Sequence, residues 1–137
     1  MMRSMVRLLL GAGLVAGGAV AAPAASADDG AAAAPLTVIQ LSVVPQLGSG
    51  AARTATLECD PVGGTHPNAK VACAELDAAN GDIRQVPSRS GYGCLGIWLP
   101  VTATATGYWH GVPITPYSET FSNDGCARIG HGYVLDF

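Results

Sequence analysis

The sequence predicts an α+β domain of about five antiparallel strands and one or two short helices, stapled by disulfides. Three observations predict this class. Several short runs alternate between apolar and polar residues, which is typical of strands with one buried face. A single stretch has its apolar residues at helical spacing. Four cysteines follow an export signal, and an even cysteine count in a small exported domain indicates a disulfide framework.

The first 27 residues have the features of a signal peptide. Arg3 and Arg7 form a basic n-region, residues 8–22 are almost wholly Leu, Val, Ala and Gly, and Ala25-Ser26-Ala27 has the small-x-small form that signal peptidase accepts. A retained membrane anchor needs about 20 strongly apolar residues, whereas this stretch has about fifteen. We therefore expect cleavage after Ala27, a secreted, extracellular product and no membrane attachment of the mature chain.

The mature chain is expected to be one domain behind a short arm. Residues 28–35 carry no periodic apolar pattern and are predicted to be flexible. Residues 36–137 are enough for one hydrophobic core and too few for two. Loss of the leader leaves 7 − 2 = 5 basic residues against ten acidic ones, a formal charge of 5 − 10 = −5. An acidic domain argues against a nucleic-acid partner, which selects a basic surface.

The first elements of the domain are predicted to be a hairpin. Residues 36–44 are dense in β-branched and apolar residues and stop at Pro45, while residues 53–59 place Ala55, Leu57 and Cys59 against polar neighbours. The intervening Gln-Leu-Gly-Ser-Gly has turn composition. Two strands joined by a turn of this kind form an antiparallel pair.

The next segment is predicted to be helical. Residues 68–80 carry Val71, Ala72, Leu76 and Ala79 at helical spacing, and Gly81 stands where a helix C-cap is expected. Residues 82–86 are expected to form a second, weaker helical or turn segment. Together these give the one or two short helices of the predicted class.

A glycine-rich loop and three more strands are expected in the second half of the domain. Residues 88–96 form the predicted exposed loop. Residues 97–106 alternate Val101, Ala103 and Ala105 with threonines and are predicted to be a strand. Residues 113–121 and 132–137 are also predicted to be strands, with the Ser-Asn-Asp-Gly-Cys-Ala-Arg-Ile-Gly segment between them as a loop.

No motif in the chain supports an enzyme. The histidines and carboxylates would suffice for a Ser-His-Asp set, but there is no G-x-S-x-G elbow, no phosphate-binding glycine loop and no H-E-x-x-H pair. Cys59, His66, Cys73 and another histidine are suitable zinc ligands by type, yet the gaps of seven residues between the first three are wider than the C-x-x-C spacing of structural zinc sites. An exported chain also oxidises such cysteines. We expect no catalytic residues, no metal and no cofactor.

The four cysteines are predicted to form two disulfides. Cys59, Cys73, Cys94 and Cys126 all lie in the mature chain, and on the sequence alone they allow three connectivities. In the sequential pairing each bridge would contribute roughly 3–4 kcal/mol by the chain-entropy relation. That is a large share of the roughly 5–15 kcal/mol by which a domain is stable.

The loop around Cys94 has two interpretations. A protease inhibitor needs an exposed segment that enters the enzyme's cleft as a substrate does and is held firmly enough that hydrolysis is slow. Here Cys94 would anchor one side of such a segment, and Pro100 with the strand from Val101 the other. A segment held in this way has already lost much of its conformational freedom, so binding costs less. The alternative is a simple connection, since glycine-rich loops beside disulfides are common.

Short strings along the chain separate these interpretations. They are Thr56-Leu57-Glu58-Cys59-Asp60-Pro61, Gly64-Thr65-His66-Pro67, Ala72-Cys73-Ala74-Glu75-Leu76, the Cys94 loop with Pro100-Val101, Gly107-Tyr108-Trp109-His110-Gly111, Phe121-Ser122-Asn123 with Cys126, and the aromatic terminus at Phe137. In this order, over residues 36–137, they resemble the Streptomyces subtilisin inhibitor family. The resemblance implies a five-stranded antiparallel sheet with two helices, the sequential disulfide pairing, a homodimer formed through the sheets, and inhibition of extracellular subtilisin-like serine proteases.

The resemblance also implies a reactive bond. In that family the bond lies two residues past the third cysteine, which places it at Gly96-Ile97. Cys94 and Leu95 then occupy the adjoining acyl-side subsites, Gly93 the next one, and Trp98 the second leaving-group position.

The chain departs from the family pattern at these subsites. The family generally offers a long side chain to the protease's primary pocket, whereas this chain offers Gly96, and Gly93 stands where subtilisins prefer a large apolar group. An empty pocket forgoes roughly 1.5–3 kcal/mol of side-chain burial. The resemblance still makes protease inhibition the expected function. Because of these two departures, the alternative is a non-inhibitory secreted binding or protease-substrate module on the same scaffold.

Overall fold

The computed structural model describes Gly18 and residues 33–137. The predicted signal peptide, its cleavage site and most of the predicted arm lie outside the described residues, so these remain predictions. Within the described part of the chain, no helix is both long and apolar enough to span a bilayer.

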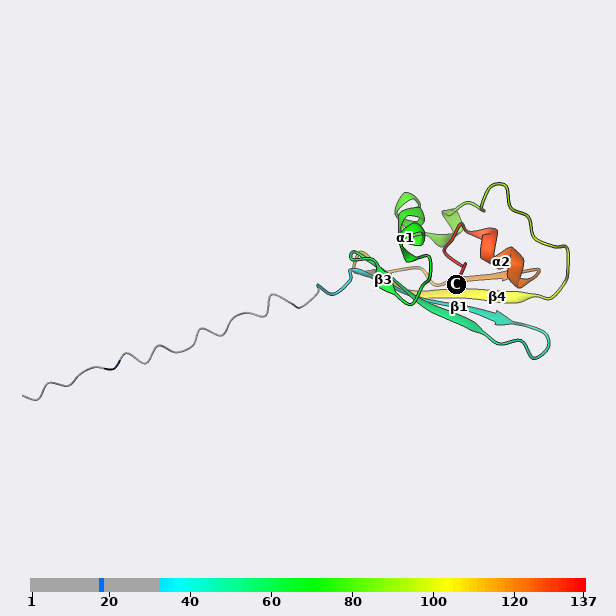
Figure 1. The fold of residues 1–137 in the computed structure, drawn as a ribbon, viewed down its shortest axis with the longest axis horizontal. Helices are drawn as coiled ribbons and strands as arrows, with labels where there is room; N and C mark the ends of the chain where they lie inside the picture. Colours follow the sequence, from blue (N-terminus) through cyan, green and yellow to red (C-terminus); the bar gives the residue numbers. More distant parts are fainter. Residues whose placement is uncertain (1–17, 19–32) are drawn as a thin grey trace, which may run out of the picture. The chain divides into compact units, whose positions relative to one another are not determined.

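An antiparallel sheet forms one layer of the domain (Figure 1). Its strands are β1 (Thr37–Pro45), β2 (Arg53–Cys59), β3 (Gly63–Gly64), β4 (Val101–Trp109), β5 (Val112–Pro113) and β6 (Tyr117–Phe121). The order is β3-β2-β1-β4-β5, and β6 also pairs with β4. Four strands of ordinary length and two of two residues confirm the predicted sheet of about five antiparallel strands.

The register of the sheet turns the apolar residues of its central strands toward one face. Leu41 of β1 lies opposite Ala55 of β2 and Ala105 of β4, and Val43 lies opposite Ala103. All five side chains are at most 5 % exposed. The residues between them carry mainly hydroxyl and amide groups and face away from the core, as the period-two pattern requires.

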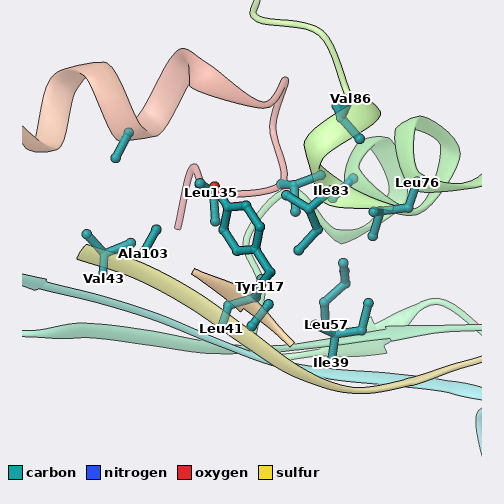
Figure 2. Close-up of a cluster of buried hydrophobic side chains, with 14 of the residues drawn as sticks. Ile39, Leu41, Val43, Leu57, Leu76, Ile83, Val86, Ala103, Tyr117 and Leu135 are labelled. Atoms are coloured by element: carbon teal, nitrogen blue, oxygen red, sulfur yellow. The ribbon is translucent and has the colours of Figure 1, made fainter. Parts of the chain in front are cut away.

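Both helices cover the apolar face of the sheet (Figure 1). Helix α1 (Ala69–Ala78) presents Leu76, and the 3₁₀ turn η1 (Ile83–Gln85) presents Ile83. Figure 2 shows these two side chains pointing toward Ile39, Leu41 and the neighbouring side chains of the sheet. The prediction of one helix followed by a weaker helical turn is confirmed.

The second helix lies where the sequence predicted a loop. Helix α2 (Asp124–Gly130) begins after Asn123, whose side-chain oxygen accepts a hydrogen bond from the backbone N–H of Cys126 at 3.0 Å. Asp124 and Arg128 form an ion pair one turn apart at 2.9 Å. Glycines at both ends of the segment gave it the composition of a loop, but this cap and ion pair stabilise a short helix.

The predicted strand at residues 132–137 is wrong. Val134 and Leu135 are adjacent and both fully buried, which a strand with one buried face does not allow. Instead, Val134 N–H donates to His131 O and Asp136 N–H to Tyr133 O, each at 3.1 Å. The segment is a series of turns that fills the core from above the sheet.

Two other strand boundaries differ from the prediction. Strand β4 begins at Val101 rather than at Ile97, because the backbone of residues 97–99 bonds to the start of α2 and not to a strand. The predicted strand over residues 113–121 is divided into β5 and β6 by residues 114–116. The loop before β4 is therefore four residues longer than predicted.

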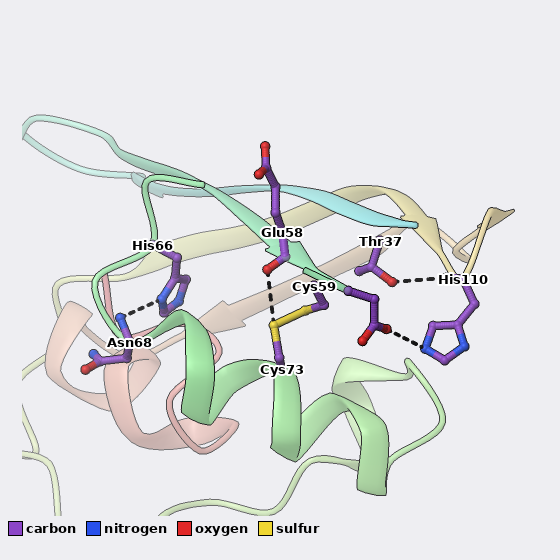
Figure 3. Close-up of a disulfide and its surroundings, with 8 residues drawn as sticks. Thr37, Glu58, Cys59, His66, Asn68, Cys73 and His110 are labelled. Atoms are coloured by element: carbon purple, nitrogen blue, oxygen red, sulfur yellow. Dashed lines mark hydrogen bonds and ion pairs between the residues drawn. A yellow bond between two sulfur atoms is a disulfide. The ribbon is translucent and has the colours of Figure 1, made fainter. Parts of the chain in front are cut away.

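The disulfides follow the sequential pairing. Cys59 at the end of β2 is linked to Cys73 in α1, which ties the helix to the sheet (Figure 3), and Cys94 is linked to Cys126 in α2. Figure 3 also shows His110 N–H donating to the Thr37 hydroxyl at 3.0 Å. The first disulfide thus belongs to the scaffold, and the second one reaches the exposed loop.

Candidate functional site

The candidate site is the loop between η1 and β4. Every residue from 91 to 99 is exposed, and the side chains of Leu95 and Trp98 are 73 % and 69 % exposed. The loop lies at the same end of the domain as the turn that joins β1 to β2 (Figure 1). Large apolar side chains that are grouped and exposed to solvent on a small domain typically mark a surface that binds a partner.

Covalent and backbone links hold the second half of this loop. The Cys94–Cys126 disulfide fixes it to α2. The N–H of Leu99 donates to Ser122 O at 2.8 Å, and the N–H of Gln46 donates to Pro100 O at 2.8 Å. Residues 94–100 are therefore anchored at both ends, while the side chains of residues 95–99 stay in solvent.

The amide of Asn123 braces the middle of the loop. Its Nδ2 donates to the backbone oxygen of Leu95 at 2.7 Å and to that of Ile97 at 2.9 Å. Those two carbonyls belong to the Leu95-Gly96 and Ile97-Trp98 peptide units, so the units on both sides of the Gly96-Ile97 peptide are held by one side chain. Within the described residues, Gly96 O itself accepts no hydrogen bond, which leaves it open to a partner.

Arg89 holds the first half of the loop. Its N–H donates to Ile129 O at 3.0 Å, and its guanidinium makes an ion pair with Asp136 at 3.2 Å. The same guanidinium lies 4.3 Å from the ring centre of Tyr133 and 4.9 Å from that of Tyr92. Because Tyr92 is itself in the loop, this cation–π contact connects the loop to the C-terminal turns.

A hollow of about 600 Å³ separates the loop from the β1–β2 turn. Leu47 of the turn and Leu95, Ile97 and Leu99 of the loop line it. The loop is thus held by its ends and by Asn123 rather than by burial of its own side chains, which remain available for contact.

The structure places the sequence-predicted site residues in one segment and adds two supports. Gly93, Cys94, Leu95, Gly96, Ile97 and Trp98 all lie in the exposed loop. Asn123 and Arg89 were given no role in the sequence, because the loop carbonyls that Asn123 holds and the carboxylate that Arg89 pairs with lie more than 25 residues away along the chain. The N-cap position of Asn123, ahead of Asp124, was the one local signal that could have drawn attention to it.

The residues whose types would suit zinc have structural roles. Cys59 and Cys73 are joined to each other. His66 is buried, with Nδ1 accepting from the N–H of Asn68 and Nε2 facing Val134 O, each at 3.0 Å. Burial lowers the pKa of His66 and favours this neutral form. Among the described residues, no three His, Cys, Asp or Glu side chains are grouped to hold a metal ion.

An exposed loop with one peptide braced on both sides, carried by a disulfide-linked sheet, is the arrangement expected of a protein that inhibits proteases through a loop. The sequence model of the family described as subtilisin inhibitor-like matches residues 34–123. The chain belongs to this family, as its resemblance to the Streptomyces inhibitors predicted. The family consists of protease inhibitors and not of enzymes.

Relatives and a solved structure agree with this membership. The chain is 41 % identical over 91 residues to the protease inhibitor SIL-V2 of Streptomyces orinoci, covering 65 % of this chain and 83 % of the relative. It is 38 % identical over 91 residues to the transglutaminase-activating metalloprotease inhibitor of Streptomyces mobaraensis, covering 65 % and 61 %.

The solved structure is that of Streptomyces caespitosus sermetstatin in complex with Bacillus licheniformis subtilisin. Its chain matches with a TM-score of 0.59 and 27 % identity, covering 74 % of this chain and 98 % of that one.

Proposed function

We propose that the mature chain is a secreted inhibitor of subtilisin-like serine proteases that presents the Gly96-Ile97 bond to the active-site cleft. The observation that carries this proposal is the pair of hydrogen bonds from Asn123 to Leu95 O and Ile97 O. They hold the residues on both sides of Gly96 in place before any enzyme is bound. After cleavage the same bonds would keep the two new ends together, so that the bond can re-form.

The loop can bind as an added strand. An extended segment pairs its backbone with the edge of the enzyme's cleft, while alternate side chains enter its subsites. In this register Leu95 and Cys94 occupy the acyl-side subsites next to Gly96, Gly93 the following one, and Trp98 the second leaving-group subsite. Since the loop is already ordered, association loses less conformational entropy than it does with a flexible peptide.

A homodimer formed through the outer face of the sheet is part of the proposal. Ser42 of β1 lies opposite Thr54 of β2 and Thr104 of β4, and Thr104 lies opposite Ser118 of β6. This row is uncharged and faces away from the helices. A flat uncharged face suits a symmetric contact with a second copy, and it leaves the loop at the end of the sheet free.

The proposal is tested by titrating the purified mature protein against subtilisin and analysing the inhibitor afterwards by mass spectrometry. We expect stoichiometric loss of protease activity and slow cleavage between Gly96 and Ile97, with the fragments still joined by the Cys94–Cys126 disulfide. Full residual activity with rapid degradation of the loop would instead identify a non-inhibitory substrate module. Cleavage at another bond would overturn the assigned register.

A further inference from the structure

Two loop positions that face enzyme pockets in the proposed register are glycines. These are Gly96, at the primary pocket, and Gly93, three residues before it. The loop is not short of large side chains, because Leu95 is 73 % exposed and Trp98 69 % exposed. The exposed apolar surface of the loop therefore comes from Leu95, which lies between the two glycines, and from Trp98, which follows Gly96.

The fold requires glycine at neither position. Glycine is needed where φ is positive or where another group approaches too closely for a Cβ. Gly107 meets both conditions, because its φ is +137° and the backbone oxygen of Val38 would collide with a Cβ there. At Gly96 and Gly93 φ lies outside the left-handed region, and a Cβ would have no neighbour within 4 Å. A residue with a Cβ is therefore sterically allowed at both positions in the free protein.

Loop flexibility does not account for Gly96 either. Glycine is the residue that loses most conformational freedom when it is ordered, and a substrate-like loop benefits from order. Here Asn123 restrains the carbonyls before and after Gly96. Because the free protein does not require glycine at position 96, we look for the effect of Gly96 in the complex with the protease.

A serine protease discriminates among residues at the primary position by the size and charge of one pocket. That pocket is an acidic site in trypsin, an apolar slot in chymotrypsin and a small cavity in elastase. Glycine leaves a deep pocket empty, whereas a long side chain collides with the wall of a small one. The missing side chain thus weakens binding to wide-pocket enzymes and permits binding to narrow-pocket ones.

Resting on the proposed function, we propose that Gly96 is a specificity-determining residue that directs this inhibitor to serine proteases whose primary pocket is narrow. Leu95 and Trp98 supply the apolar contacts on either side of the pocket. Gly93 likewise favours proteases whose pocket for the residue three positions before Gly96 is narrow. The partner is an extracellular serine protease that cleaves after small residues.

The test compares the full mature protein with Gly96→Ala and Gly96→Met on two enzymes, subtilisin and elastase. The wild type is expected to inhibit elastase more tightly than subtilisin. In Gly96→Met, filling a wide pocket should tighten inhibition of subtilisin by roughly 10- to 100-fold, and the collision should weaken inhibition of elastase at least as much. Gly96→Ala should retain the preference for elastase.

Changes of opposite sign separate pocket selection from loop disorder. A loop loosened by substitution would bind both enzymes more weakly, and thermal unfolding of each variant reports any loss of the fold. Tighter inhibition of both enzymes by Gly96→Met, or a wild type that inhibits subtilisin as tightly as elastase, would overturn the narrow-pocket assignment.

The same experiment distinguishes failure of the proposed function. If the wild type inhibits neither enzyme while Gly96→Met inhibits subtilisin, the inhibitory role stands and the narrow-pocket assignment falls. If none of the three proteins inhibits either enzyme, both the proposed function and the assignment are wrong.

Discussion

Asn123 caps the helix that carries Cys126, and the same side chain braces the exposed loop. Its Oδ1 accepts the N–H of Cys126 at 3.0 Å, while its Nδ2 donates to the loop carbonyls on either side of Gly96. The cap therefore orients the amide that holds the loop, and the Cys94–Cys126 disulfide joins the same two elements covalently. Helix α2 therefore holds the exposed loop through both Asn123 and Cys126.

Replacing Asn123 separates its two roles. Asn123→Asp keeps an oxygen for the helix cap, so its free energy of unfolding should stay within about 0.5 kcal/mol of the wild type. It loses both donors to the loop, which at about 1 kcal/mol each should weaken inhibition of subtilisin by roughly 30-fold. Subtilisin should also cleave the Gly96-Ile97 bond of Asn123→Asp faster than that of the wild type, as measured by mass spectrometry.

Asn123→Ala is the matched control, because it removes the donors and the cap together. It should show the same loss of inhibition and a further loss of about 1 kcal/mol in stability. If Asn123→Asp inhibits as well as the wild type, Asn123 does not support the loop.

The elements that were predicted correctly from the sequence are those in which buried and exposed residues alternate at a regular spacing within the element itself. Strands β1, β2 and β4 alternate because one face is buried along most of β1 and β2 and the first half of β4, and that period is visible in Leu41 and Ala103 with their neighbours. Helix α1 shows its spacing for the same reason. Such patterns need no knowledge of distant residues.

The remaining elements depend on contacts between distant residues. Val134 and Leu135 are buried side by side because the turns after α2 cross the core, and an apolar pair of this kind is also typical of a strand. The role of Asn123 depends on residues 26 and 28 positions earlier. No local period encodes either relationship, whereas the proposed reactive segment was assigned from the resemblance to a family.

The two disulfides should have separable effects. Replacing either pair by serines should lower the free energy of unfolding by about 3–4 kcal/mol, since each bridge closes a chain loop. Cys59 and Cys73 join scaffold elements, so the variant without them should still inhibit subtilisin at temperatures where it is folded. The variant without Cys94 and Cys126 should instead be cleaved rapidly at the loop.

Urea unfolding and mass spectrometry after incubation with subtilisin provide the comparison. Each variant serves as the control for the other, because both lose one bridge of similar expected strength. Equal loss of inhibition in the two folded variants would contradict a special role for the second bridge.

A charge on the outer face of the sheet should dissociate the proposed dimer. Thr104 lies opposite Ser42 at the centre of the uncharged row, so Thr104→Arg would bury an unpaired charge at a cost of roughly 3–5 kcal/mol. Sedimentation at micromolar concentration should show a dimer for the wild type and a monomer for Thr104→Arg. Ser90→Arg, in the exposed loop stem, is the control and should remain dimeric. A monomeric wild type would refute this mode of assembly.

Acid should destabilise the domain through His66. Its Nδ1 accepts from the N–H of Asn68, so protonation of that nitrogen breaks a buried hydrogen bond, and burial already lowers the pKa of His66. The nearby carboxylates of Asp136 and Glu75 favour the protonated form but do not reverse that direction.

The sign of the effect follows from which state binds the proton. A histidine in the unfolded chain titrates near pH 6.5, about where a free side chain does, and in the folded domain it titrates lower. The stabilisation is therefore fully present above about pH 6.5 and is lost as the pH falls through the lowered pKa of His66, by at most about 1.4 kcal/mol per pH unit. Urea unfolding of the wild type between about pH 7.5 and 5.5 should show this decline. His66→Gln, which cannot titrate, should be less stable at neutral pH and change less over the same range; identical slopes for the two proteins would exclude His66 as the source.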